Sequence, residues 1–274
     1  MSTQATAPAG LPAAPDRITL HNLMRSEWTK LRSVRSNMVT LAAAAGALLF
    51  IGLIFSAMVG GVVGNPPADA GDDPAGVALA GVQVAQLIIG VLGVLAITSE
   101  YSTGTIRTTL TAVPSRLPVV WAKVAVVTIA TFSVLGISAF VTFFAGQVLI
   151  GSGDVDTAAL GDPGVLRAVL GAAAFLTGTA LLGLALGGLL RSTAGAISTL
   201  FGIIFVLPGL GFILLPESLR DDLLQYLPTT AGSSFTSVAP DSSQLSPTMG
   251  AAVFAAWILV PLLGAALAFV RRPA

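Results

Sequence analysis

Residues 124–153 read VAVVTIATFSVLGISAFVTFFAGQVLIGSG, a run of 30 positions without one Asp, Glu, Lys, Arg or His. A helix of about 20 apolar residues is long enough to cross the roughly 30 Å hydrocarbon core of a bilayer. The run is continuously apolar and lacks the alternation of a β-barrel strand, and backbone groups in lipid must be satisfied within the segment. The stretch therefore predicts a membrane-spanning helix.

Five further runs lack ionisable side chains and are long enough to span, namely 36–68, 74–99, 168–190, 192–216 and 242–270. Together the runs predict an all-α integral membrane protein with six transmembrane helices at about 39–63, 77–98, 119–150, 168–190, 194–215 and 248–270. We expect a single transmembrane domain over 17–272. The preceding residues, 1–16, are mainly Ala, Pro, Thr and Ser and predict a disordered cytoplasmic tail.

The composition excludes several classes of protein. Of the 274 residues, 54% are hydrophobic and only 9% are charged, whereas soluble domains carry about 25% charged residues. There is no Cys and a single His, His21, which excludes disulfides, thiolate metal sites and two-His metal motifs. No GxxxxGK[ST] phosphate loop occurs, and the predicted spans hold no Asp, Glu or His, the groups that drive a proton-coupled carrier. We expect no catalytic residue, metal site or cofactor in this chain.

Basic residues set the orientation of the spans. With both termini inside, only Arg167 and Arg220 fall outside, and the positive-inside rule is satisfied. The inside segments then hold Arg17, Arg25, Lys30, Arg32, Arg35, Arg107, Arg116, Lys123, Arg191, Arg271 and Arg272.

The segment 17–35 precedes the first span. Apolar residues recur there at helical spacing, and Lys30 and Arg32 are among the basic residues that lie between them. This pattern predicts an amphipathic interfacial helix on the inner surface with Trp28 at the level of the headgroups. The alternative is a generic basic flank of the first transmembrane helix.

Two connections between spans stand out. In the inside loop 98–118, Glu100 lies near the start, where an acid favours a helix N-terminus, and Gly104 and Pro114 bracket a short helix at 105–113. The alternative is a solvated connector. After the fifth span, Pro208 and nearby glycines weaken the helix, and leucines between 219 and 227 predict a re-entrant or amphipathic outer segment. A folded cap without function is the alternative there.

The order of these motifs relative to the spans resembles the membrane subunits of ABC-2 type (type-2) ABC transporters. The motifs are Glu27-Trp28, Lys30-Leu31-Arg32, Glu100-Tyr101-Ser102-Thr103-Gly104-Thr105, Pro114-Ser115-Arg116 and Trp121-Ala122-Lys123. The resemblance implies that the inside loop forms a cytoplasmic coupling helix between spans 2 and 3. Its ATPase-coupling segment would contain Glu100, Gly104, Thr105, Arg107, Pro114, Arg116 and Lys123.

The resemblance further implies a permease subunit of an ATP-driven bacterial exporter in the plasma membrane. Two copies of a separate ATP-binding cassette subunit would bind the ATP, and a second permease subunit would complete a homodimer or close heterodimer. The chain has no large extracellular domain, which favours export of a lipophilic small molecule, drug or lipid; lipid is an expected partner and nucleic acid is not. The alternatives are a membrane-embedded anchoring or enzymatic subunit with no transport role, and an independent secondary carrier.

Overall fold

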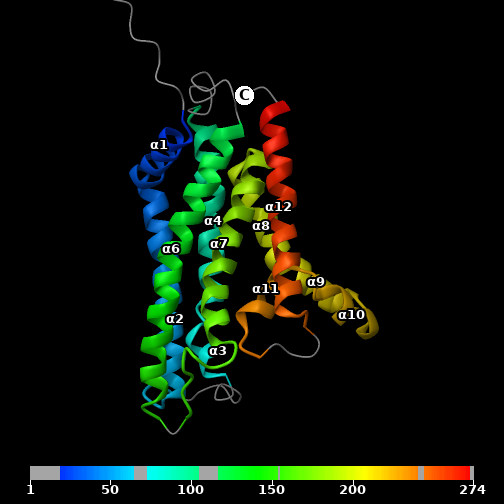
Figure 1. Ribbon diagram of the computed structural model, residues 1–274. Coiled ribbons are helices and arrows are strands. Elements are labelled where there is room, and N and C mark those ends of the chain that lie inside the picture. Colours follow the sequence, from blue (N-terminus) through cyan, green and yellow to red (C-terminus); the bar gives the residue numbers. More distant parts are fainter. Residues whose placement is uncertain (1–18, 65–72, 105–116, 154, 240–243, 272–274) are drawn as a thin grey trace, which may run out of the picture.

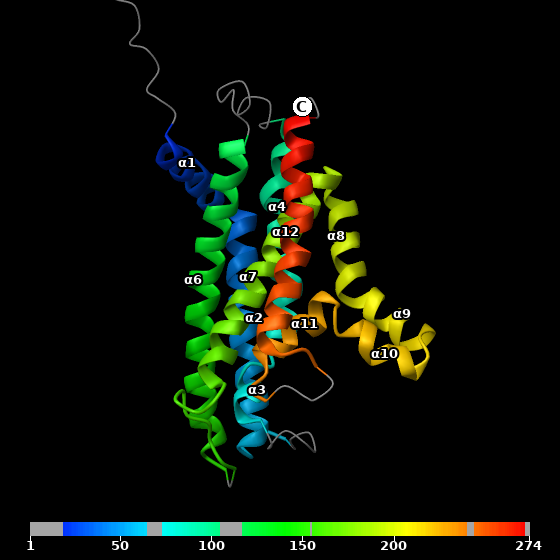
Figure 2. The same ribbon diagram turned by 45° about the vertical axis from the view of Figure 1, so that its right-hand side comes forward.

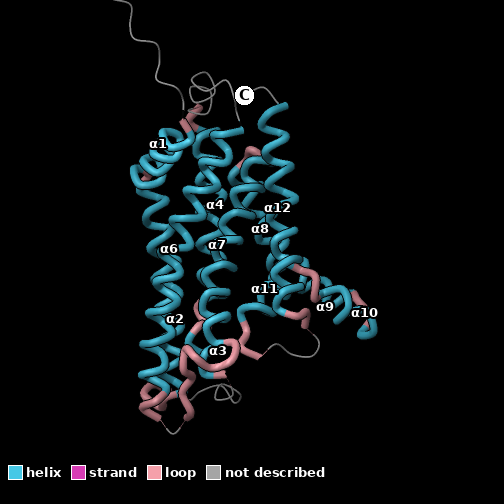
Figure 3. Tube along the Cα trace, in the orientation of Figure 1, coloured by secondary structure: helices cyan, strands magenta, loops and turns pink. Residues whose placement is uncertain are grey.

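The computed structural model describes residues 19–64, 73–104, 117–153, 155–239 and 244–271, which fold into helices joined by turns, with no strand among them (Figure 3). The predicted all-α fold is confirmed. The predicted tail at 1–16 and the predicted coupling helix at 105–113 lie outside the described residues. In chain order the helices are α1 (Leu20–Ser33), α2 (Arg35–Val59), α3 (Pro74–Ala78), α4 (Val82–Ser102), α6 (Leu117–Ile150), α7 (Val165–Leu190), α8 (Thr193–Phe201), the π-helix η1 (Gly202–Val206), α9 (Leu207–Leu214), α10 (Glu217–Leu224), α11 (Pro228–Thr236) and α12 (Pro247–Arg271).

Six helices in the described chain are long and apolar enough to cross a membrane, as predicted: α2, α4, α6, α7, the continuous helix Thr193–Leu214, and α12. Figure 1 shows most of them standing side by side in one bundle. Helix α7 is central, since it packs against α4, α6 and α12 and 83% of its most apolar stretch is buried. The corresponding share for Thr193–Leu214 is 11%, which makes that helix the most peripheral.

Small residues allow α4 and α7 to approach closely. A Cβ atom added at Gly93 would collide with the carbonyl oxygen of Ala180, and one added at Gly183 would collide with that of Gly90. Such backbone proximity is the usual way in which small residues pack membrane helices, where burial of apolar surface supplies no driving force.

The bundle has one end that gathers basic residues. Helix α1, the last turn of α4, the start of α6 and the end of α12 meet there (Figures 1 and 2), and we call it the basic end. Helix α1 bends away from α2 at Val34, whose backbone is extended, and packs on α6. Its buried residues are Glu27 and Leu31, while Leu20 and Trp28 are exposed.

The fifth span departs from a straight helix. Our prediction placed a weak point at its outer end, but the helix continues to Leu214 and widens earlier, into η1. Pro208 lacks an N–H group, and its ring would clash with the carbonyl of Ile204 in a regular α-helix. The π-helical turn accommodates this residue, and α9 and α10 then leave the bundle sideways before α11 returns beside α12 (Figures 1 and 2).

Candidate functional site

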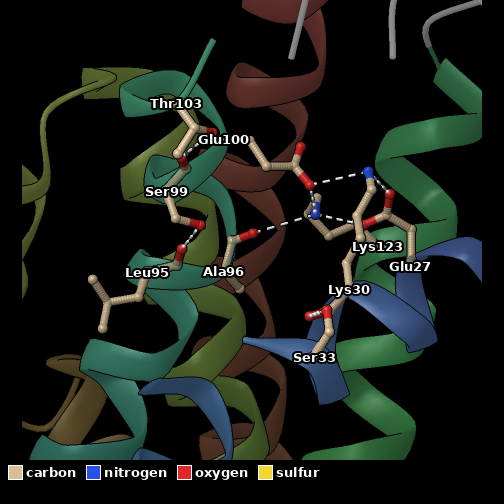
Figure 4. A network of polar contacts seen from close by, with 9 residues as sticks. All are labelled: Glu27, Lys30, Ser33, Leu95, Ala96, Ser99, Glu100, Thr103 and Lys123. Atoms are coloured by element: carbon tan, nitrogen blue, oxygen red, sulfur yellow. Dashed lines mark hydrogen bonds and ion pairs between the residues drawn. The ribbon is translucent and has the colours of Figure 1, made fainter. Parts of the chain in front are cut away.

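Two lysines and two glutamates converge at the basic end from three different helices (Figure 4). Helix α1 supplies Glu27 and Lys30, the last turn of α4 supplies Glu100, and the second turn of α6 supplies Lys123. The sequence separations reach 96 residues, so tertiary packing assembles this group. We call it the four-charge cluster.

Each carboxylate of the four-charge cluster bridges both ammonium groups. Oε1 of Glu27 lies 2.6 Å from Nζ of Lys30, and Oε2 of Glu27 lies 2.5 Å from Nζ of Lys123. Oε1 of Glu100 accepts hydrogen bonds from Lys30 at 3.1 Å and from Lys123 at 2.9 Å. Lys123 also donates to the carbonyl oxygen of Ala96 at 3.2 Å, which uses all three of its N–H groups.

The four-charge cluster is largely removed from solvent. The exposed fractions of the side chains are 5% for Glu27, 11% for Glu100, 9% for Lys123 and 30% for Lys30. Buried charges are costly unless each has a partner, and here the formal charges sum to zero. Burial by itself lowers the pKa of Lys30, but the hydrogen bond and charge of Glu27, joined by those of Glu100, outweigh burial and raise that pKa above its usual value. Lys30 is therefore charged at neutral pH.

The end of α4 also contacts the turn between α7 and α8. The guanidinium carbon of Arg191 lies 5.3 Å from the centre of the Tyr101 ring, within the range of a cation–π contact. Arg191 has a left-handed backbone with φ of 54°, the conformation that ends α7. Neighbouring residues of α4 thus face different partners: Glu100 faces α1 and α6, and Tyr101 faces Arg191.

The structure brings three of the predicted site residues together, namely Lys30, Glu100 and Lys123. Gly104 follows α4 with φ of +70°, and Trp28 and Arg32 are exposed on α1. The four remaining predicted residues, Thr105, Arg107, Pro114 and Arg116, lie outside the described residues.

One prediction about Glu100 was wrong. Glu100 does not begin a helix, because α4 continues to Ser102 and places the residue near a helix C-terminus. A carboxylate is unfavourable at that end of the helix dipole. The two lysines supply the compensation that the local sequence does not.

Sequence reasoning quoted Glu27 only as part of a motif and missed its role in the site. A signal was present, since Glu27 lies four residues from both Leu23 and Leu31 and therefore on the packed stripe of α1. An acid on such a stripe requires a buried cation. Lys30 and Lys123 are the only lysines in the chain.

A comparison with protein families identifies the type of protein. Residues 23–209 match the model described as ABC-2 family transporter protein. The chain belongs to the ABC-2 family. The match begins within α1 and extends into α9, so it includes every member of the four-charge cluster. No curated protein sequence matches the chain.

Membership of the ABC-2 family makes the chain a multi-pass transporter permease and implies an ATP-binding cassette partner. Such permeases are typically non-catalytic components of the membrane. Within the described ranges, no group of three or more His, Cys, Asp or Glu residues could hold a metal ion. The four-charge cluster links α1, α4 and α6 through its ion pairs.

Proposed function

We propose that the chain is the permease subunit of an ATP-driven ABC-2 exporter and that the four-charge cluster transmits motion from the ATPase to the spans. The observation that carries this proposal is the position of Glu100 and Lys123. They lie just before and just after the loop 105–116, and both are bonded to α1. A force applied to that loop would therefore act directly on α4 and α6 and, through the ion pairs of the cluster, on α1.

The proposed assembly contains two ATP-binding cassette subunits and a second permease subunit, in the plasma membrane of a bacterium. The basic end faces the cytoplasm, so both termini are inside. The exported solute is a lipophilic small molecule, drug or lipid, which suits a chain whose spans are almost entirely apolar. ATP binds to the partner, because this chain has no phosphate loop.

Orientation is tested by labelling single cysteines in intact cells with a membrane-impermeant thiol reagent. The chain has no Cys, so each variant carries one target. Gly161 and Ser33 are both exposed but belong to opposite ends of the bundle. Gly161→Cys is expected to react and Ser33→Cys is not; the reverse pattern would invert the proposed topology.

The function is tested by purifying the tagged full chain in mild detergent and identifying bound proteins by mass spectrometry. We expect an ATP-binding cassette subunit to copurify and the isolated chain to lack ATPase activity. Absence of such a subunit would favour an anchoring or enzymatic role without transport. ATP turnover by the pure chain alone would exclude the permease proposal.

Coupling is tested in proteoliposomes that contain the complex. Glu100→Gln and Gly104→Val should leave the ATPase bound but reduce its stimulation by the permease about fivefold or more, in the range of coupling between linked sites. Glu217→Gln, at an exposed acid of α10, is the matched control and should behave as the unmodified chain. Full stimulation in both test variants would remove the cluster and loop from the mechanism.

A further inference from the structure

A cavity of about 300 Å³ lies directly beside the four-charge cluster. Its walls come from α1, the first turn of α2, the end of α4 and the start of α6. One wall is polar and carries the charged groups. The rest of the lining is mainly apolar and includes Leu31, Val126 and Val127. The volume is at the lower end of the range for small-molecule sites.

Asn37 of α2 lines this cavity and is 4% exposed. Its Oδ1 atom is buried and accepts no hydrogen bond from the described part of the chain. An orphaned amide oxygen is uncommon in native proteins and destabilises the fold unless another molecule satisfies it. The position of Asn37 therefore indicates a ligand that donates hydrogen bonds.

The four-charge cluster retains unused bonding capacity toward the same cavity. Both hydrogen bonds to Glu100 end on Oε1, and no described residue donates to Oε2. Lys30 uses two of its three N–H groups. The first turn of α2, which contributes Asn37 to the cavity lining, has no side-chain cap in the described structure, so its positive end is available beside Lys30. Two acceptors thus adjoin a positively charged edge.

We infer that this cavity binds the head group of a phospholipid with a primary ammonium group, phosphatidylethanolamine, from the leaflet at the basic end. The ammonium donates to Oδ1 of Asn37 and Oε2 of Glu100, and the phosphate faces Lys30 and the first turn of α2. Since the four-charge cluster is neutral, a zwitterion adds no net charge to a buried site. A trimethylammonium has no N–H to donate, and a glycerol head group has no positive charge for Glu100.

A lipid is the occupant because the apolar wall of the cavity continues toward the membrane. Val34, 37% exposed, lines the cavity at the bend between α1 and α2. Val39, on the next turn, is 67% exposed and belongs to a predicted span. Acyl chains can therefore follow α2 while the head group enters. This inference goes beyond the proposed function and does not rest on it, because binding requires neither ATP nor a partner subunit.

The first test uses the unmodified full chain in detergent and measures retained lipid by native mass spectrometry. Four lipids with identical acyl chains are compared: phosphatidylethanolamine, its N-methyl and N,N-dimethyl derivatives, and phosphatidylcholine. Affinity is expected to fall stepwise as N–H groups are replaced by methyl groups, with a total loss of about tenfold or more. Equal affinity for all four lipids would overturn the inference, and this measurement does not depend on any variant folding.

The second test removes the orphaned acceptor. Asn37→Leu should reduce the preference for phosphatidylethanolamine over phosphatidylcholine by about threefold or more, because Glu100 alone then remains to accept from the ammonium. Gln86→Leu is the matched control, because Gln86 is 1% exposed and its amide oxygen also lacks a partner among the described residues, but it does not line the cavity. The inference fails if Asn37→Leu keeps the full preference or if Gln86→Leu loses it.

The third test distinguishes the lipid from a free head group. Glycerophosphoethanolamine presents the same ammonium and phosphate without acyl chains. At equal concentration it should displace less than about a tenth of the bound lipid, since it leaves the apolar wall uncovered. If glycerophosphoethanolamine displaced the bound lipid as well as intact phosphatidylethanolamine does, a soluble solute would fit equally well, and the assignment to a membrane lipid would be wrong.

Discussion

Helix α4 contacts α7 along most of its length but contacts α1 and α6 through the four-charge cluster at one end. The contact with α7 is built from glycines and backbone, as the close approach of Gly93 to the carbonyl of Ala180 shows. The contact at the basic end is built from long side chains around a cavity of about 300 Å³. One contact has no room for adjustment, and the other has both room and rotatable side chains.

The difference indicates where the permease can move. The close-packed contact between α4 and α7, which we call the α4–α7 seam, weakens if the helices separate by even a fraction of an ångström. The reason is that dispersion attraction falls steeply with distance. Ion pairs between flexible side chains can follow small displacements of the helices that carry them. We therefore expect α4 and α7 to move as one body, and α1 with the start of α6 to rearrange relative to it.

The largest expected effect comes from breaking the seam. Gly93→Val would place a branched side chain against the Ala180 carbonyl, and backbone cannot rotate away as a side chain can. We expect the free energy of unfolding to fall by more than about 4–5 kcal/mol, a size of effect seen only with severe disruption of a core. Membrane abundance and thermal unfolding in detergent would measure it.

Gly46→Val is the control for the seam, because a Cβ at Gly46 of α2 meets no atom within 4 Å. This variant should be as abundant and as stable as the unmodified chain. If Gly93→Val were equally harmless, the seam would be loose and the contrast between the two contacts of α4 would disappear.

The next largest effect comes from opening the four-charge cluster. Lys123→Met keeps the length of the side chain but leaves two carboxylates with a single cation. Removing one member of a buried ion pair typically costs about 3–5 kcal/mol. Arg271→Met removes an exposed cation of α12, near the same end, and should change stability by less than about 0.5 kcal/mol.

A second substitution should rescue that loss. Adding Glu27→Gln to Lys123→Met restores neutrality, with Lys30 and Glu100 still paired. Residues in contact commonly deviate from additivity by about 0.5–3 kcal/mol, and here the deviation should be favourable. A double variant as unstable as the sum of the single variants would mean that charge balance does not hold α1 against α6.

The sequence predicted the membrane spans that pack together but did not predict the four-charge cluster. Spans follow from long charge-free runs such as 124–153, because lipid excludes ionisable groups wherever a helix crosses it. Pro208 likewise predicted a disturbance in the fifth span. The π-helical turn lies on the N-terminal side of the proline, because the proline ring meets the preceding turn of the helix.

The four-charge cluster was beyond such reasoning for a physical reason. Glu27 and Lys123 are 96 residues apart, and their contact depends on the bend at Val34 that lays α1 across α6. The local pattern placed Glu100 near the start of the inside loop 98–118, ahead of a short helix, because the end of α4 could not be placed within one turn. Charge counting could have indicated that the few inside acids need partners, but not which lysine each one meets.

The smallest predicted effect concerns the polar contact between α6 and α7. Thr131 and Thr177 are buried, and their hydroxyl oxygens lie 3.3 Å apart. In a double-mutant cycle of Thr131→Val and Thr177→Val, we expect a coupling energy of about 0.6 kcal/mol and no more than about 1.7 kcal/mol. The reason is that the single hydroxyl proton of Thr131 has an acceptor in its own helix, the Val127 carbonyl at 2.7 Å, so losing Thr177 leaves little unsatisfied. Thr128→Val, whose hydroxyl bonds only within α6 in the described structure, is the control and should show no coupling to Thr177. A Thr131–Thr177 coupling as large as the rescue in the four-charge cluster would mean that neutral contacts inside the spans hold the bundle as strongly as charges do at the basic end.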